Sequence, residues 1–136
     1  MPTHTAACAY DGWYTYTAAN GREGRCYAQV WQPRAGIPVV IVTEPADNPG
    51  PSVTNATEAL ATQLWHALLP QSHEGFRLIE VYLDTANAAR GAERLAEVSY
   101  TLRGNRLASA RYRHTTRAQV EALIGGPFSA PFESSY

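Results

Sequence analysis

A continuous apolar run constrains what this chain can fold into more than any other feature. Residues 37–42 are all apolar, whereas a strand with one face in water alternates apolar and polar side chains. Such a run is typical of a strand that is buried on both faces. Segments rich in Pro, Gly and Asn bound it at residues 33–36 and 44–51. The sequence therefore predicts a central strand of a sheet.

Two further strands are expected before this run. Residues 13–17 are aromatic and β-branched, and residues 25–32 alternate in polarity, as strands do. Between them, Asn20 and Gly21 tolerate positive φ, which indicates a hairpin or a short loop. The second strand has a small apolar face and an opposite, larger face: Cys26, Ala28 and Val30 against Tyr27, Gln29 and Trp31.

A helix is expected next. Asn55 can cap it, and Glu58, three residues later, can close a capping box. Apolar residues then recur at helical spacing up to Leu68. Pro70 predicts an end by about Leu69, because the residue before a proline avoids helical geometry.

The C-terminal half returns to strands. Residues 76–84 alternate, with Ile79 on one face and Glu80 on the other, and residues 95–102 and 106–114 are expected to pair through a two-residue turn at 104–105. On the last of these strands, residues 107, 109, 111 and 113 are expected to share a face opposite Ala108 and Ala110. A second helix is expected from Thr116 to Ile124, where a Gly-Gly-Pro stretch stops it.

These elements predict one α+β domain over residues 1–136, in the order βββ-α-βββ-α. Hairpin connections predict a mainly antiparallel sheet, with the main helix packed on one face and a short C-terminal helix. Residues 1–9 and 128–136 are candidate mobile tails. The N-terminus lacks the pattern of a secretory signal and no stretch is long enough for a membrane span, so we expect a cytoplasmic protein that does not enter membranes.

The charge is unevenly distributed along the chain. The net charge is −1, and all eleven basic residues are arginines. Seven of them lie between residues 90 and 117, where only Glu93 and Glu97 oppose them. Such asymmetry points to an acidic or nucleic-acid partner, although nucleic-acid binding usually requires more net positive charge.

The usual signatures of catalysis and metal binding are missing from the sequence. There is no serine elbow and no glycine-rich phosphate loop. Cys26, in the middle of an apolar strand face, is expected to be a small core residue. His66 and His73 do not have the spacing of paired metal ligands. We therefore predict no catalytic group, no metal and no cofactor.

Three groups of residues are candidates for binding. The loop after the central strand, with Glu44, Asp47 and Asn55, lies where a strand ends and a helix begins, a favoured place for small ligands. The same residue types also build an ordinary turn and helix cap.

The second candidate is an aromatic group on the first two strands, which consists of Tyr14, Tyr16, Tyr27 and Trp31. As one exposed cross-strand cluster, it would anchor a protein or stack on bases. Facing the helix, it would belong to the core.

The third candidate is a basic hairpin with Arg103, Arg106, Arg111 and Arg113. Guanidinium groups in a row can bind phosphate or carboxylate in a bidentate manner. The alternative is an ordinary solvent-exposed hairpin in which Glu97 is a cross-strand partner.

The leading functional hypothesis is a small non-enzymatic interaction module, an adaptor, regulator or inhibitor of the kind that mobile elements carry. Its partner would be another protein or a second copy of the chain. The second hypothesis is nucleic-acid binding through the aromatic group and the basic hairpin. The third is a small-ligand binder or enzyme centred on the loop at 44–55. Residues 47–55 and 116–124 resemble segments of small bacterial proteins, and this resemblance implies no activity and no functional residue.

Overall fold

The computed structural model describes residues 7–17, 21, 23–32, 36–43, 55–69, 74–83, 93–103 and 106–128. The chain forms a small α+β domain, and the elements of the described ranges follow the expected βββ-α-βββ-α order. In sequence they are β1 (Ala7–Thr17), β2 (Glu23–Gln32), β3 (Val39–Thr43), α1 (Asn55–Leu68), β4 (Gly75–Leu83), β5 (Glu93–Arg103), β6 (Arg106–Thr115) and α2 (Arg117–Ile124).

The six strands form a single sheet in the order β1-β2-β3-β4-β5-β6. All neighbours are antiparallel except β3 and β4, which are parallel. The sheet is therefore mixed, and the expectation of a mainly antiparallel sheet did not include this central pair. The physical reason is the connection, because a chain that leaves β3, crosses over through α1 and returns can place the next strand parallel to the first.

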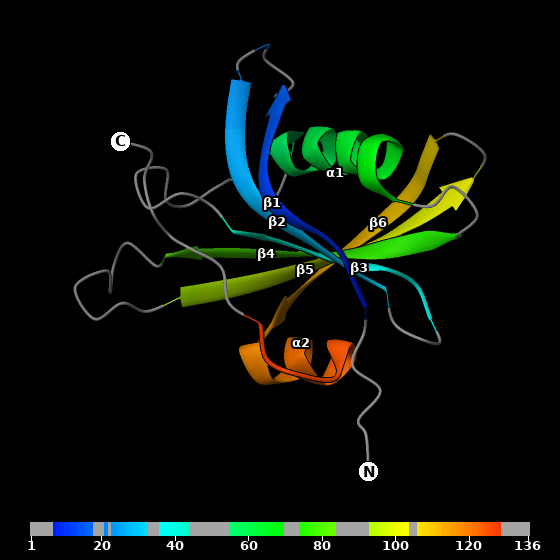
Figure 1. The fold of residues 1–136 in the computed structure, drawn as a ribbon. Coiled ribbons are helices and arrows are strands. Elements are labelled where there is room, and N and C mark those ends of the chain that lie inside the picture. The colour runs from blue at the N-terminus through cyan, green and yellow to red at the C-terminus, as the bar shows by residue number, and fades with distance from the viewer. Residues whose placement is uncertain are drawn as a thin grey trace, which may run out of the picture.

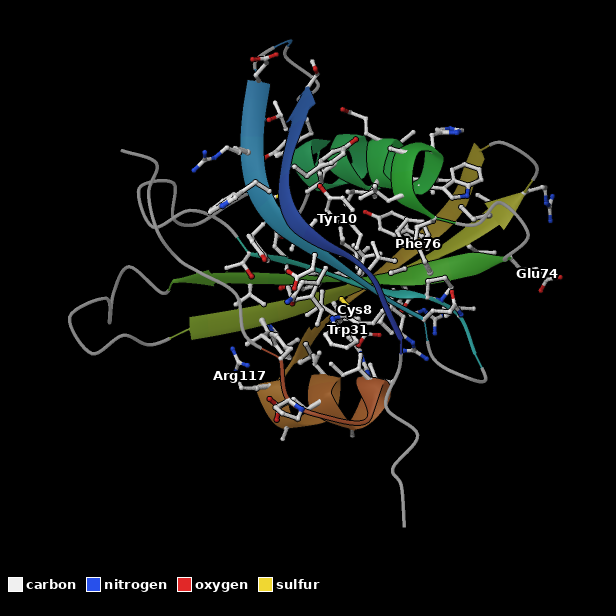
Figure 2. The ribbon with its side chains drawn as sticks, viewed as in Figure 1. Cys8, Tyr10, Trp31, Glu74, Phe76 and Arg117 are labelled. Carbon is white, nitrogen blue, oxygen red and sulfur yellow. The ribbon has the colours of Figure 1, made fainter. Side chains whose placement is uncertain are left out.

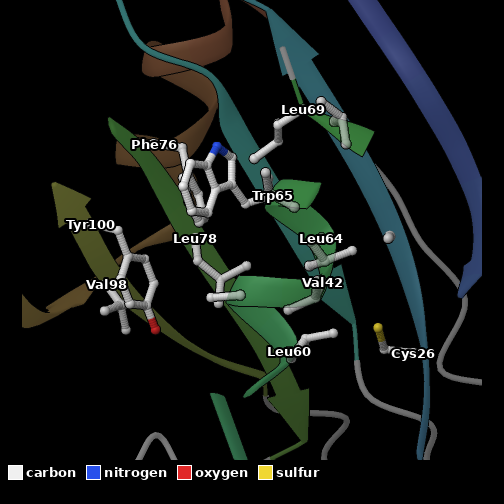
Figure 3. Packing of buried hydrophobic residues seen from close by; sticks show 14 of the residues in the cluster. Cys26, Val42, Leu60, Leu64, Trp65, Leu69, Phe76, Leu78, Val98 and Tyr100 are labelled. Atoms are coloured by element: carbon white, nitrogen blue, oxygen red, sulfur yellow. The ribbon is translucent and has the colours of Figure 1, made fainter. Parts of the chain in front are cut away.

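The two helices cover opposite faces of the sheet, and β1 and β2 rise beside α1 (Figure 1). The core under α1 is the larger one, and its helix side is formed by Leu60, Ala61, Leu64, Trp65 and Leu69. Figure 3 shows these side chains packed on the sheet, with Trp65 close to Phe76. All five residues of β3 are buried, which confirms the prediction of a central strand.

A second core lies under α2. The sheet contributes Val39, Ile41, Ile79, Val81 and Leu95, and the other side consists of Val120, Ile124 and Phe128. Burial of Phe128 corrects the expectation that the tail begins there. Residues 129–136 lie outside the described residues.

The ends of both helices agree with the predictions. α1 ends at Leu68, before Pro70. At α2, the backbone N–H of Gln119 donates to the Thr116 hydroxyl at 3.2 Å. Gly125 closes that helix with φ of 80°, in the left-handed region that glycine adopts without strain. None of the described helices is both long and apolar enough to cross a membrane.

Two strands differ from the expectation. β1 begins at Ala7 rather than at Trp13, so residues 7–9 belong to the sheet and only 1–6 of the expected tail lie outside the described residues. On β6, the register shifts so that Ala108 is an extra residue between Leu107 and Ser109. Because such a bulge reverses the alternation, Leu107 packs against the α1 core and does not share a face with Arg111 and Arg113.

The close approach of β4 and β5 at Gly75 yields a stability prediction. A Cβ atom at this position would collide with the carbonyl oxygen of Tyr100, which is backbone and cannot rotate away. We expect Gly75→Ala to lower the free energy of unfolding by about 1–3 kcal/mol. Gly12→Ala is the matched control, because the atom nearest to its added Cβ would be the Tyr10 hydroxyl at 3.6 Å, an ordinary van der Waals contact. Urea unfolding of both variants checks this, and equal losses would contradict it.

Candidate functional site

The four aromatic residues of the predicted cluster do not share one face of the sheet. Tyr14 pairs with Cys26 rather than with Tyr27, so Tyr14 and Tyr16 lie on the α1 face and Tyr27 and Trp31 on the α2 face. The expectation of one cluster was wrong because the register of β1 against β2 sets Tyr14 and Tyr27 on opposite sides. Figure 2 shows Trp31 on the side of α2.

On the α1 face, the two tyrosines belong to the core or its border. Tyr16 is buried, and its ring fills the space that a Cβ on Gly24 would occupy. Tyr14 packs against the same core, and burial is the main cause that raises its pKa. Neither side chain offers an open aromatic surface.

On the α2 face, Tyr27 packs with Trp13 and Arg25 in a cluster that the sequence had not indicated. Its ring meets Trp13 edge-on at 5.3 Å between centroids, and the Arg25 guanidinium lies 4.1 Å from the centroid of the Trp13 ring. A hydrogen bond to Asp11 is the largest cause that raises the pKa of Tyr27. Trp13 has the opposite parity to Tyr14 and Tyr16, and this was the signal that it lies on the other face.

The loop candidate remains a prediction. Glu44 and Asp47 lie outside the described residues. Asn55 is the first residue of α1, and its side chain also lies outside what the structure describes.

A buried carboxylate holds arginines together at the β4–β6 end of the same α2 face. Glu97 on β5 is 1% exposed. It accepts hydrogen bonds from Arg77 Nη1 at 2.8 Å, from Arg113 Nη2 at 3.1 Å and from Ser99 Oγ at 3.1 Å. Burial, the largest influence, acts to raise the pKa of this carboxyl. The hydrogen bonds from Arg113, Arg77 and Ser99 together outweigh burial, so the pKa of Glu97 is lowered.

Glu97 therefore holds two guanidinium groups in place on the α2 face. The side chains of Arg77 and Arg113 are 34% and 55% exposed, so their other N–H groups reach solvent. Arg111 lies beside them, opposite Ser99 in the register. It is exposed, and it has no ion-pair partner among the described residues. Among the described side chains, three guanidinium groups here face one carboxylate, which leaves an excess of positive charge.

The remaining arginines of the predicted basic hairpin lie at its far end. Arg103 and Arg106 are cross-strand partners. Arg103 is exposed, whereas the side chain of Arg106 lies outside the described residues. The structure thus brings Arg111 and Arg113 together with Arg77, which sequence reasoning missed. Only strand order could reveal it, because Arg77 is distant in sequence.

The α1 face of β6 is chemically different. Tyr112 is 44% exposed and is the exposed large hydrophobic residue of the described ranges. Ala110 and His114, which point to the same side, are also exposed, and the ring centroids of Tyr112 and His114 lie 5.6 Å apart. β6 therefore has guanidinium groups on one face and an aromatic, small-residue surface on the other.

The two edge strands of the sheet differ in how much of their backbone is already engaged. On β1, the Gln63 side chain of α1 donates to the Thr17 carbonyl at 2.6 Å and accepts from the Thr17 N–H at 3.0 Å. The Tyr10 hydroxyl donates to the Trp13 carbonyl at 2.9 Å. A register shift lies between Cys8 and Tyr10. Such features hinder pairing with another strand.

β6 has no comparable protection within the part of the chain that the structure describes. It is ten residues long, and among the strands that the structure describes its only neighbour is β5. None of the side-chain hydrogen bonds between described residues ends on the backbone of β6. An edge strand presents a row of N–H and C=O groups that can pair with another chain. The outer edge of β6 is therefore the best candidate for a functional site.

The other candidate chemistries find little support in the described ranges. No group of His, Cys, Asp or Glu side chains there could hold a metal ion. Cys26 is fully buried, which confirms the prediction of a core residue. Compared with protein-family models, curated protein sequences and solved structures, the chain matches none of them. The function must therefore be argued from the geometry.

Proposed function

We propose that this protein is a non-enzymatic interaction module that binds another protein stoichiometrically through the outer edge of β6. One observation carries the proposal: β6 is a ten-residue edge strand whose outer side has no partner among the described residues. Addition of a strand from a partner is a common mode of recognition at such an edge, because the main-chain hydrogen bonds supply affinity.

The side chains of β6 support this role. Tyrosine and arginine are the residue types most enriched at the energetic centres of protein interfaces, and β6 exposes Tyr112 on one face and Arg111 and Arg113 on the other. Charged side chains on an edge also suppress indiscriminate pairing between strands. The same residues would therefore keep the free protein from aggregating and select its partner.

The two other functions that the sequence suggested have less support than protein binding at β6. Nucleic-acid binding relied on Tyr14, Tyr16, Tyr27 and Trp31 as one stacking surface, and these residues lie on two faces of the sheet. The small-ligand hypothesis relies on the loop at 44–55, most of which lies outside the described residues. It stays a prediction.

The test is a tagged pull-down from host lysate at about 150 mM salt, where exposed charges act over a Debye length of about 8 Å. Half of the lysate is treated with nuclease, and bound protein is quantified by mass spectrometry. We expect a stoichiometric protein that survives nuclease, and at least about tenfold less of it with Tyr112→Ala, because interface tyrosines are frequent hot spots.

Tyr27→Ala is the matched control, as an aromatic truncation on β2 at a distance from β6. Circular dichroism melting of both variants shows that each is folded at the assay temperature. Loss of capture with Tyr27→Ala and not with Tyr112→Ala would mean that the partner binds at Tyr27 on β2 and not at the edge of β6. Capture that disappears with nuclease in the wild type would favour nucleic-acid binding.

A further inference from the structure

We infer that the segment bound at β6 is an acidic strand that alternates carboxylate and apolar side chains. This inference rests on the proposed function and states the chemistry of its partner. The added strand would extend the sheet beyond β6, with its carboxylates on the α2 face and its apolar side chains on the α1 face.

The α2 face of β6 selects for negative charge. Arg111 and Arg113 lie two residues apart, so both side chains stand on this face, opposite Ser99 and Glu97. A strand added beside β6 would place alternate side chains next to them, within the range of cross-strand pairs. Carboxylates at those positions would meet guanidinium groups, which bind them in a bidentate geometry.

Glu97 prepares this face for a second carboxylate instead of neutralising it. It binds one nitrogen each of Arg77 and Arg113, at 2.8 and 3.1 Å, and thereby holds both guanidinium groups on this face before a partner arrives. It is buried, so it is not itself presented to the partner. Arg111 has no ion pair in the described ranges, so its fork is free for the incoming strand.

The α1 face of β6 selects for apolar side chains. Ala110 and Tyr112 are exposed there, while the neighbouring Tyr100 and Val98 of β5 are covered by the core. A strand beside β6 would place its other side chains against the Tyr112 ring and the small residue next to it. Alternation of charge on one face and apolar surface on the other follows from the period of two in a strand.

Charge also argues against a second copy of this chain as the occupant. Two β6 strands paired antiparallel around Tyr112 would set Arg111 of one copy opposite Arg113 of the other on the same face. Like charges directly opposite each other destabilise a strand pair. An acidic strand removes this repulsion and adds attraction.

The test uses the full chain and synthetic peptides as long as β6. The first peptide alternates glutamate with valine. In the second, lysine replaces each glutamate, and in the third, a central proline interrupts the first sequence. We expect the first peptide to bind in fluorescence anisotropy and to protect β6 amides from hydrogen exchange. We expect no binding of the second or third, because the second repels the arginines and the third cannot continue a ladder.

Arg111→Glu is expected to weaken binding of the first peptide about five- to tenfold, since it replaces an exposed attraction by repulsion. Arg25→Glu makes the same change in net charge on β2, an interior strand beside β1 and distant from β6. This control should leave the affinity within about twofold. Higher salt should also weaken the first peptide's binding, because the arginines are exposed.

The following outcomes would overturn the inference. They are failure of the first peptide to bind, equal binding of the lysine peptide or of the proline peptide, and equal losses with Arg111→Glu and Arg25→Glu. A β6-dependent dimer in sedimentation would make a second copy the occupant. If a single-stranded oligonucleotide binds more tightly than the first peptide and loses affinity with Arg111→Glu, the occupant of this surface is a nucleic acid. If the peptides fail while Tyr112→Ala still abolishes partner capture, the proposed function stands and only the acidic strand is wrong.

Discussion

Replacing Trp65 by alanine should lower the free energy of unfolding by about 3–5 kcal/mol, the usual cost of deleting a large aromatic side chain from a packed core. Trp65 is 1% exposed and lies between α1 and the sheet, near Phe76 and Leu64 (Figure 3). The alanine variant loses buried apolar surface and leaves a cavity in this core. For a domain of this size, that loss is a large part of the total stability.

Urea unfolding followed by circular dichroism measures this effect. His66→Ala is the control, because His66 is the next residue on the same helix and is exposed. Its ring lies beside that of Trp65, with 4.6 Å between the ring centroids. We expect the control to change the stability by about 0.5 kcal/mol or less. A loss below about 1 kcal/mol for Trp65→Ala would mean that the α1 core is not packed as described.

The second large effect is expected at Glu97. Glu97→Gln keeps the shape of the side chain and removes the charge that holds Arg77 and Arg113. Breaking a buried charge pair is costly because the remaining charge loses its partner. Both arginines are partly exposed, so water compensates some of that loss. We expect a decrease in the free energy of unfolding of about 2 kcal/mol at neutral pH.

The same variant should remove part of the pH dependence of stability. The pKa of Glu97 is lowered in the folded protein, so between that value and the unfolded one the unfolded chain binds more protons, and stability rises with pH. The contribution is complete above the ordinary glutamate pKa of about 4.3. It is lost as the pH falls through the lower folded value. The difference between wild type and Glu97→Gln should therefore shrink in acid.

Urea unfolding at a series of pH values from neutral to about pH 3 tests this. Glu121→Gln is the control, because its ion pair with Arg117 on α2 is 3.6 Å long and both side chains are partly exposed. Such surface pairs contribute about 0.5 kcal/mol or less. A gap between wild type and Glu97→Gln that stays constant in acid would show that the charge of Glu97 is not what stabilises the fold.

The candidate site could be predicted from the sequence only in part. The concentration of arginines around the last hairpin was visible as charge asymmetry, and Glu97 was expected as a cross-strand partner of the hairpin arginines, as found for Arg113. The contribution of Arg77 was not visible. Arg77 and Arg113 are brought together only because β4, β5 and β6 are neighbours in that order, and sequence periodicity carries no information on strand order.

The sequence by itself determined the local elements of this protein. The apolar run at 37–42, the cap at Thr116 and Gly125 at the end of α2 depend on residues near one another in the chain, so they could be read without the fold. The tertiary structure decided which residues share a surface. A shift of one residue reverses the face of every side chain, so the register of β1 and the bulge at Ala108 separated residues that alternation alone had grouped. Burial was decided in the same way, because helices cover both faces of the sheet and Glu80 and Glu97, one on each face, are both buried.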